Sequence, residues 1–171
     1  MIMNKLSFKA VGLDTERAFV STANGIENKV ALLRLCSGAH CLIVQLLHLE
    51  SVSNTLANFL SCPHLSFSGV GIGHSLTRLR RDYGLECRNG IELGSMAASA
   101  LVDDKYRVFG LVDLADAVSG VSVNKPSSTS LSDWSGKHLT PQQIQSATFG
   151  AYVSYVIATT LLQRKLCRFV K

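Results

Sequence analysis

The stretch Val11-Gly12-Leu13-Asp14-Thr15-Glu16 decides how this sequence is interpreted. It is an apolar segment that ends in two carboxylates, Asp14 and Glu16, with one residue between them. In a β-strand, residues i and i+2 point to the same face, so both carboxylates project into one small volume. Two like charges held that close repel each other unless a cation lies between them, and Mg²⁺ or Mn²⁺ prefer carboxylate oxygen. The motif therefore predicts a candidate divalent-metal site on a strand.

The composition is that of one ordered globular domain. The chain has 171 residues, of which 47% are hydrophobic and 17% charged, so we expect a single domain over 1–171 with a full core. The net charge of +5 permits a polyanionic partner without requiring one. The sequence has no apolar run long enough for a transmembrane helix and no apolar signal-peptide region at its start. We therefore expect an intracellular protein, in the nucleus or the cytoplasm, with no membrane partner.

The cysteines are scattered along the chain without metal-binding spacing. There is no CxxC pair, and no histidine spacing completes a zinc site. An odd number of scattered cysteines in a core-rich chain indicates reduced thiols that act as small buried hydrophobes. This expectation covers Cys36, Cys41, Cys62, Cys87 and Cys167.

Apolar runs separated by turn signals predict an α/β fold. Strands are expected over 6–15, 30–36, 41–46, 65–72 and 91–93, with the second and third joined as a hairpin. Helices are expected over 54–61, 75–83, 95–101 and 109–118. Gly84 and Gly120 are placed to end the second and fourth of these helices. The Ser-rich stretch 124–137 is the most loop-like segment of the chain.

The last helix has the clearest start signal. Thr140-Pro141-Gln142-Gln143 supplies an N-cap residue, a proline at N1 and a glutamine at N3, which together form a capping box. Apolar residues then recur at a spacing of three to four and predict one buried stripe. The stripe consists of Ile144, Ala147, Ala151, Tyr155, Ala158 and Leu162.

Several short pieces of sequence follow the first motif in a characteristic order. They are Gly69-Val70-Gly71-Ile72, Arg81-Asp82-Tyr83-Gly84-Leu85, Trp134, Leu139-Thr140-Pro141-Gln142-Gln143 and Gly150-Ala151-Tyr152-Val153-Ser154-Tyr155. In this order, the elements resemble the DEDDy 3′–5′ exonucleases of the ribonuclease H-like superfamily, and within it the Werner-type exonuclease domain. The resemblance covers nearly the whole chain. It implies a ribonuclease H-like fold with a mixed sheet of about five strands flanked by helices, in which the Asp14 strand is central and the hairpin lies beside it.

The chemistry of this family needs four carboxylates and a tyrosine. Two ions, Mg²⁺ or Mn²⁺, activate water and stabilise the leaving oxygen during phosphodiester hydrolysis. Carried over to this chain, the first motif is intact in Asp14 and Glu16, but the aspartate of the second motif corresponds to Ser75. The Tyr-x-x-x-Asp of the third motif corresponds to Ser146 and Gly150. Two metal ligands and the tyrosine are therefore missing, and we expect at most one weakly held ion.

Neighbouring residues do not restore the ligand set. Thr15, His74 and Arg78 are assigned to substrate binding by their places beside the motifs, whereas Asp113 and Asp116 are interpreted as solvated helix acids. A glycine inside a helix costs about 1 kcal/mol relative to alanine, and the sequence offers no local reason for one at position 150. This favours a site released from the constraints of catalysis.

The sequence leaves three functions open. The main interpretation is a pseudoenzyme, a degenerate exonuclease domain that still binds the end of a single-stranded DNA or RNA. In that case, restoring Ser75→Asp, Ser146→Tyr and Gly150→Asp together is expected to raise activity. The alternatives are a still-active metal-dependent 3′–5′ exonuclease and a module that binds a protein partner or a second copy of itself. A dinucleotide-binding site is not supported, because 69–73 lacks the third glycine of GxGxxG.

Overall fold

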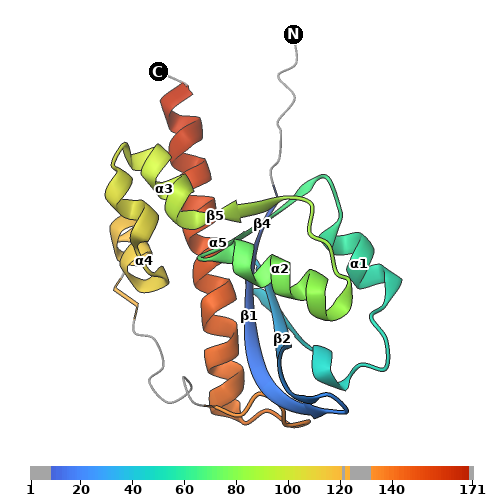
Figure 1. Cartoon of the computed structure of the whole chain (residues 1–171). Helices are drawn as coiled ribbons and strands as arrows, with labels where there is room; N and C mark the ends of the chain where they lie inside the picture. Colours follow the sequence, from blue (N-terminus) through green and yellow to red (C-terminus); the bar gives the residue numbers. More distant parts are fainter. Residues whose placement is uncertain (1–8, 121, 124–131, 170–171) are drawn as a thin grey trace.

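A mixed sheet of five strands forms the centre of the molecule (Figure 1). The structure, a computed structural model, describes residues 9–120, 122–123 and 132–169, with side chains up to residue 164. The strands are β1 (Lys9–Thr22), β2 (Gly25–Ser37), β3 (His40–Gln45), β4 (Leu65–Gly69) and β5 (Gly90–Glu92). The helices are α1 (Asn54–Leu60), α2 (Ile72–Tyr83), α3 (Leu93–Leu101), α4 (Leu111–Ser119) and α5 (Pro141–Phe169), and two 3₁₀ helices are η1 (Leu46–His48) and η2 (Asp104–Val108).

The strand that carries Asp14 is central, as predicted, because the strand order is β3-β2-β1-β4-β5. β2 pairs antiparallel with both β1 and β3, so the predicted hairpin lies beside the central strand. β4 is parallel to both β1 and β5. The predicted α/β class and the flanking helices are confirmed: α1 and α2 cover one face of the sheet, and α5 covers the other with α3 and α4 packed against it (Figure 1).

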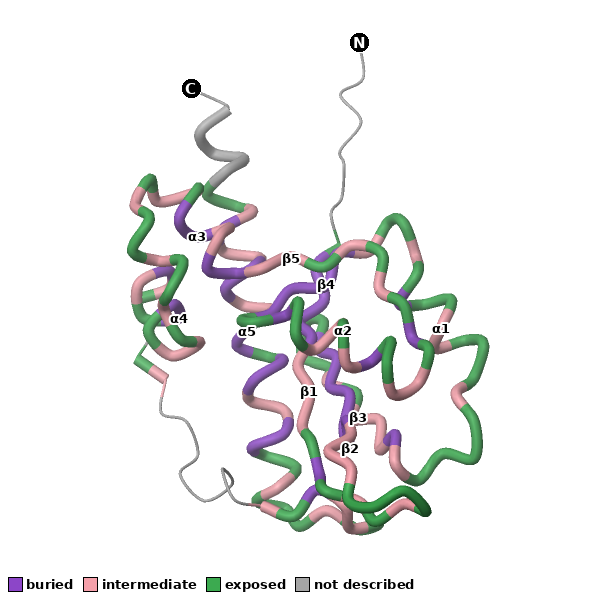
Figure 2. Tube along the Cα trace, in the orientation of Figure 1, coloured by how far each residue is buried: buried purple, intermediate pink, exposed green. Residues whose placement is uncertain are grey.

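The start of β1 contributes to both layers of the core, and β1 and α5 both contain buried segments (Figure 2). Val11 and Leu13 pack in the cluster with α1 and α2, whereas Ala10 packs in the cluster with α3, α4 and α5. Gly12 faces α5, and a Cβ there would collide with the carbonyl oxygen of Ala151. The approach of α5 to β1 therefore depends on a position without a side chain, and it places α5 directly over the Asp14 face.

The first two strands are longer than the sequence predicts. Residues 16–29, which were not assigned to strands, form the outer part of the β1–β2 hairpin, whose turn reaches Gly25 with a φ of 118°. Phe19 and Ile26 on this arm are 73% and 76% exposed, so burial does not mark it in the sequence. Main-chain pairing extends the strands beyond the core, and a strand prediction based on buried apolar runs stops too early.

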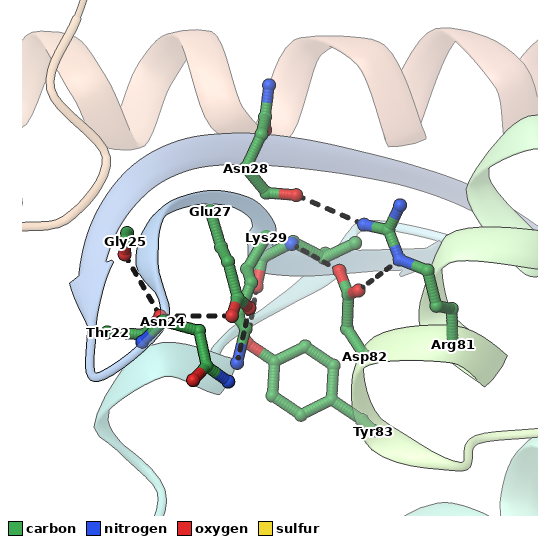
Figure 3. Close-up of polar contacts among 10 residues, drawn as sticks. Thr22, Asn24, Gly25, Glu27, Asn28, Lys29, Arg81, Asp82 and Tyr83 are labelled. Carbon is green, nitrogen blue, oxygen red and sulfur yellow. Dashed lines mark hydrogen bonds and ion pairs between the residues drawn. The ribbon is translucent and has the colours of Figure 1, made fainter.

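Three consecutive residues at the end of α2 anchor this hairpin (Figure 3). The Asp82 carboxylate accepts a hydrogen bond from the Val30 N–H at 2.9 Å, and the Tyr83 hydroxyl donates to the Val30 carbonyl at 2.6 Å. Arg81 donates to the Asn28 carbonyl at 3.1 Å and pairs with Asp82 at 2.6 Å. The inner end of β2 is thereby held at a defined distance from α2.

The other differences lie at element ends. β4 stops at Gly69 because Gly71 adopts a φ of 64°, and α2 begins at Ile72 rather than at residue 75. Gly84 and Gly120 end α2 and α4 with φ values of 65° and 66°, as predicted. Strand 6–15 begins among residues 1–8 and the loop 124–137 includes 124–131, and these residues lie outside the described part of the chain. Within the described residues, no helix combines the length and apolarity needed to cross a membrane.

α5 begins with the predicted capping box, but its buried face is wider than predicted. Thr140 and Gln143 exchange backbone-to-side-chain hydrogen bonds of 2.9 and 3.2 Å. Ile144, predicted to be in the stripe, is 45% exposed. The helix lies between the sheet and the α3–α4 pair, so residues outside the stripe are also buried, namely Val153, Ile157 and Leu161.

The expectation that all cysteines are reduced is wrong for two of them. Cys36 and Cys41 lie directly opposite each other in the β2–β3 pair and form a disulfide, with their Cα atoms 4.2 Å apart. Spacing along the chain does not reveal this pairing, because it depends on the register of the hairpin. Cys62 and Cys87 are free and half-buried, and Cys167 lies where side chains are not described.

Candidate functional site

Asp14 and Glu16 project from β1 toward α5, at the edge of a cavity of about 480 Å³. Ser146 and Gly150 of α5 line the same cavity. The structure therefore brings together four of the five positions assigned to the catalytic motifs. Both carboxylates remain about one-third exposed, with 35% for Asp14 and 34% for Glu16.

Arg34 joins the two carboxylates. It lies directly opposite Asp14 in the β1–β2 register, and its Nη2 is 2.5 Å from Asp14 Oδ2. Its Nη1 lies 3.1 Å from Glu16 Oε1, and Nη2 also donates to the Thr15 carbonyl at 3.4 Å. Only 4% of the Arg34 side chain is exposed. The sequence analysis missed Arg34, because an arginine inside an apolar strand does not reveal which carboxylates it faces until the register is known.

Steric crowding explains why position 150 is a glycine, and the sequence alone did not show this. A Cβ at this position would collide with Asp14 Oδ2 and would lie 3.6 Å from Arg34 Nη2. A tertiary contact rather than a local feature therefore accounts for this glycine, and its presence does not by itself indicate a site released from the constraints of catalysis. The absence of a side chain lets the ion pair pack against the backbone of α5.

The second-motif position lies on the other side of β1. Ser75 Oγ is 2.9 Å from Thr15 Oγ1, and Thr15 faces α2 while its neighbours Asp14 and Glu16 face α5. Ser75 thus approaches the carboxylate pair through Thr15. On the same helix His74 is exposed and Arg78 is half-buried. The described residues that line the cavity do not include Ser75, His74 or Arg78. The assignment of His74 and Arg78 to substrate binding therefore stays a prediction.

The opposite wall of the cavity comes from the start of α4. Asp113, interpreted from the sequence as a solvated helix acid, is exposed but also lines the cavity. The remaining walls are largely apolar, with the aromatic ring of Phe149 contributed by α5. The sequence analysis missed this wall because the segment between α3 and α4, which contains η2, decides where the first turn of α4 lies. Asp116 does not line the cavity and is exposed, as expected.

The residues present do not fit a two-metal centre. Among the described residues, no group of three or more His, Cys, Asp or Glu side chains is placed to hold a metal ion. The Asp14 oxygens already accept bonds from Arg34 and from the Thr15 N–H, the latter at 2.8 Å. The formal charge of the two carboxylates with Arg34 is −1, from two negative groups and one positive group. A site for two divalent ions requires more negative charge than this.

The strand order and the flanking helices define a ribonuclease H-like fold. The chain belongs to the 3′–5′ exonuclease family, whose family model matches residues 1–165. Members of this family generally use divalent metal ions.

Two curated relatives are similar in sequence. A 3′–5′ exonuclease of Arabidopsis thaliana is 27% identical over 146 residues, which cover 85% of this chain and 50% of the relative. Exonuclease 3′–5′ domain-containing protein 2 of Drosophila melanogaster is 26% identical over 163 residues, which cover 95% of this chain and 26% of the relative. The chain thus spans half or less of the length of these relatives.

Solved structures share the fold. Brucella melitensis NrnC superposes with a TM-score of 0.72 at 16% identity, covering 95% of this chain and 76% of NrnC. Escherichia coli RNase D, an exoribonuclease involved in structured RNA processing, superposes with a TM-score of 0.71 at 21% identity, covering 95% of this chain and 41% of RNase D. Other NrnC structures contain bound Mg²⁺ or pGG.

Proposed function

We propose that this domain binds the end of a single-stranded nucleic acid and does not hydrolyse it. One observation carries the proposal: a single cavity is lined by Asp14, Glu16 and Arg34 and also by Ser146 and Gly150, the two positions that the resemblance assigns to the tyrosine and aspartate of the third motif. The cavity and the first-motif carboxylates are present, whereas Ser146 and Gly150 supply neither a carboxylate nor a phenol.

Loss of hydrolysis follows from the groups that line the cavity. Two-metal hydrolysis needs ligands that hold both ions near the attacking and leaving oxygens. Gly150 supplies no ligand atom, and a side chain there has no room beside Asp14. Asp113 is the remaining acid among the described lining residues, and it does not complete a metal-binding group with Asp14 and Glu16.

Retained binding is supported by the shape and lining of the cavity. A volume of about 480 Å³ is of the order of a small-molecule pocket. Phe149 offers a ring on which a base can stack, and Val70 and Leu111 add apolar walls. Arg34 lowers the repulsion between the carboxylates and a phosphate group, and the chain has a net charge of +5. The pGG bound by NrnC, which shares the fold, also supports a nucleic-acid ligand.

The test is fluorescence anisotropy with labelled single-stranded DNA and RNA of equal length. We expect binding that weakens with salt, because phosphate contacts release counterions. Phe149→Ala is expected to lower affinity about tenfold, since stacking contributes about 1–3 kcal/mol per base. The matched control is Tyr152→Ala, which removes an exposed aromatic ring from the same helix outside the cavity and should change affinity little.

Incubation of the same strands with Mg²⁺ or Mn²⁺ tests for hydrolysis. Digestion from the 3′ end that disappears in Asp14→Ala would establish an active exonuclease and reject the proposal. Failure to bind either nucleic acid would reject it as well, and a stable complex with another protein would then favour the interaction module.

A further inference from the structure

The guanidinium of Arg34 has the geometry of a bridging cation. Its two terminal nitrogens contact different carboxylates, Nη2 at 2.5 Å from Asp14 and Nη1 at 3.1 Å from Glu16. The planar fork of an arginine keeps these nitrogens at a fixed separation, so both contacts form with one side-chain orientation. A divalent ion between the same two carboxylates would compete with the guanidinium for Asp14 Oδ2 and Glu16 Oε1.

Arg34 is held so that it cannot leave this position easily. Its side chain is 4% exposed and lies between β1, β2 and α5. Within the described part of the chain its Nε is buried without a hydrogen-bond partner, so the side chain is already packed where water does not reach it. Moving the guanidinium out would leave two carboxylates close together without a counterion. An ion from solution therefore competes with a cation that is preorganised by the fold.

We propose that Arg34 is the resident cation of this site and takes the place of the divalent ions. The folding of the domain, and its binding of nucleic acid, then do not depend on divalent metal. The statement on nucleic acid rests on the proposed function, whereas the statement on folding does not.

Thermal unfolding tests the statement on folding. The melting temperature of the wild-type chain should be the same in EDTA, Mg²⁺ and Mn²⁺. Arg34→Gln removes the charge and keeps a polar side chain of moderate length. It should melt at a lower temperature in EDTA, and Mn²⁺ should raise that temperature saturably, by about 3–6 °C at ten times the Kd.

The matched control is the triple variant Asp14→Asn, Glu16→Gln, Arg34→Gln. It has no charge at the three positions and differs from Arg34→Gln only by two isosteric carboxamides, so it should fold without metal and show no response to Mn²⁺. If Arg34→Gln folds only when Mn²⁺ is present, the proposal is supported. If Arg34→Gln does not respond to Mn²⁺ while the triple variant folds, the proposal is rejected.

Wild-type calorimetry with Mn²⁺ gives a result even if both variants fail to fold. No heat of specific binding is expected, and a site that binds Mn²⁺ in the micromolar range would overturn the proposal. Anisotropy with labelled single strands completes the test, and the Kd should agree within about twofold in EDTA and in Mg²⁺. Binding that requires Mg²⁺ would reject the resident cation but not the proposed function, whereas absence of binding would reject the proposed function and leave the melting and calorimetry results to decide on Arg34.

Discussion

Gly150 on α5 and Asp14 on β1 are in steric contact, because a Cβ at position 150 would collide with Asp14 Oδ2. Alanine usually stabilises a helix interior by about 1 kcal/mol relative to glycine. Here we expect Gly150→Ala to destabilise the fold by about 1–3 kcal/mol, as overpacking does. Urea denaturation measures the change.

Gly73→Ala is the control for this prediction. Gly73 lies in α2, and a Cβ at this position would meet open space, so alanine there should leave the stability unchanged or raise it. Equal changes in the free energy of unfolding for the two substitutions would show that the contact with Asp14 does not exclude a side chain at position 150.

Restoring the missing motif residues is expected to fail while Arg34 is present. The variant in question is the triple substitution Ser75→Asp, Ser146→Tyr, Gly150→Asp. Its new carboxylate at position 150 would lie near Arg34 Nη2 and pair with it, and the new Cβ would collide with Asp14. The expectation from the sequence that this triple variant gains activity is thereby revised. Arg34→Gln removes the guanidinium that pairs with Asp14 Oδ2, so the Asp14 carboxylate is free to turn away from a Cβ at position 150. Adding this substitution should therefore produce Mn²⁺-dependent release of nucleotides from a labelled strand, and activity in the triple variant alone would contradict this reasoning.

Tyr83 should make stability depend on pH in the alkaline range. Its pKa is raised from 10.0 to about 12, first by burial and second by the charge of Asp82. The folded state therefore keeps the phenolic proton where the unfolded state releases it. This contribution is complete below about pH 10 and is lost as the pH rises from 10 through 12.

Tyr83→Phe removes both this titration and the hydrogen bond to the Val30 carbonyl. At pH 8 we expect the variant to be about 1 kcal/mol less stable than wild type. The difference should shrink between pH 10 and pH 12, as measured by urea denaturation at each pH. A constant difference across this range would be evidence against the raised pKa.

Asp82 should matter for stability more than a surface acid does. Its side chain is 3% exposed and accepts the hydrogen bond from the Val30 N–H. Asp82→Ala leaves that N–H without a partner and should cost about 1–3 kcal/mol. Asp116→Ala, at an exposed position of α4, is the control and should change stability by less than about 0.5 kcal/mol. Similar losses in both variants would argue against the anchoring of β2 by α2.

The sequence alone determined those features that depend on neighbours within a few residues. The capping box of Thr140 and Gln143, the helix ends at Gly84 and Gly120, and the apolar strand before Asp14 are all formed by local interactions. The order of these elements also predicted the α/β class, and together with the family resemblance it predicted the central place of β1. Such signals can be read because the atoms that interact are close along the chain.

Only the tertiary structure decided the state of the site. Arg34 meets Asp14 because of the β1–β2 register, and Cys36 meets Cys41 because of the β2–β3 register. Gly150 meets Asp14 because α5 lies close over the sheet. A shift of one residue in register would turn these side chains to the other face. The register depends on which face of each strand is buried and on the irregularity between Glu16 and Arg17, and both appear only when the strands are paired. The sequence, through its resemblance to the family, predicts which metal ligands are missing, and the tertiary structure decided that an arginine contacts both Asp14 and Glu16.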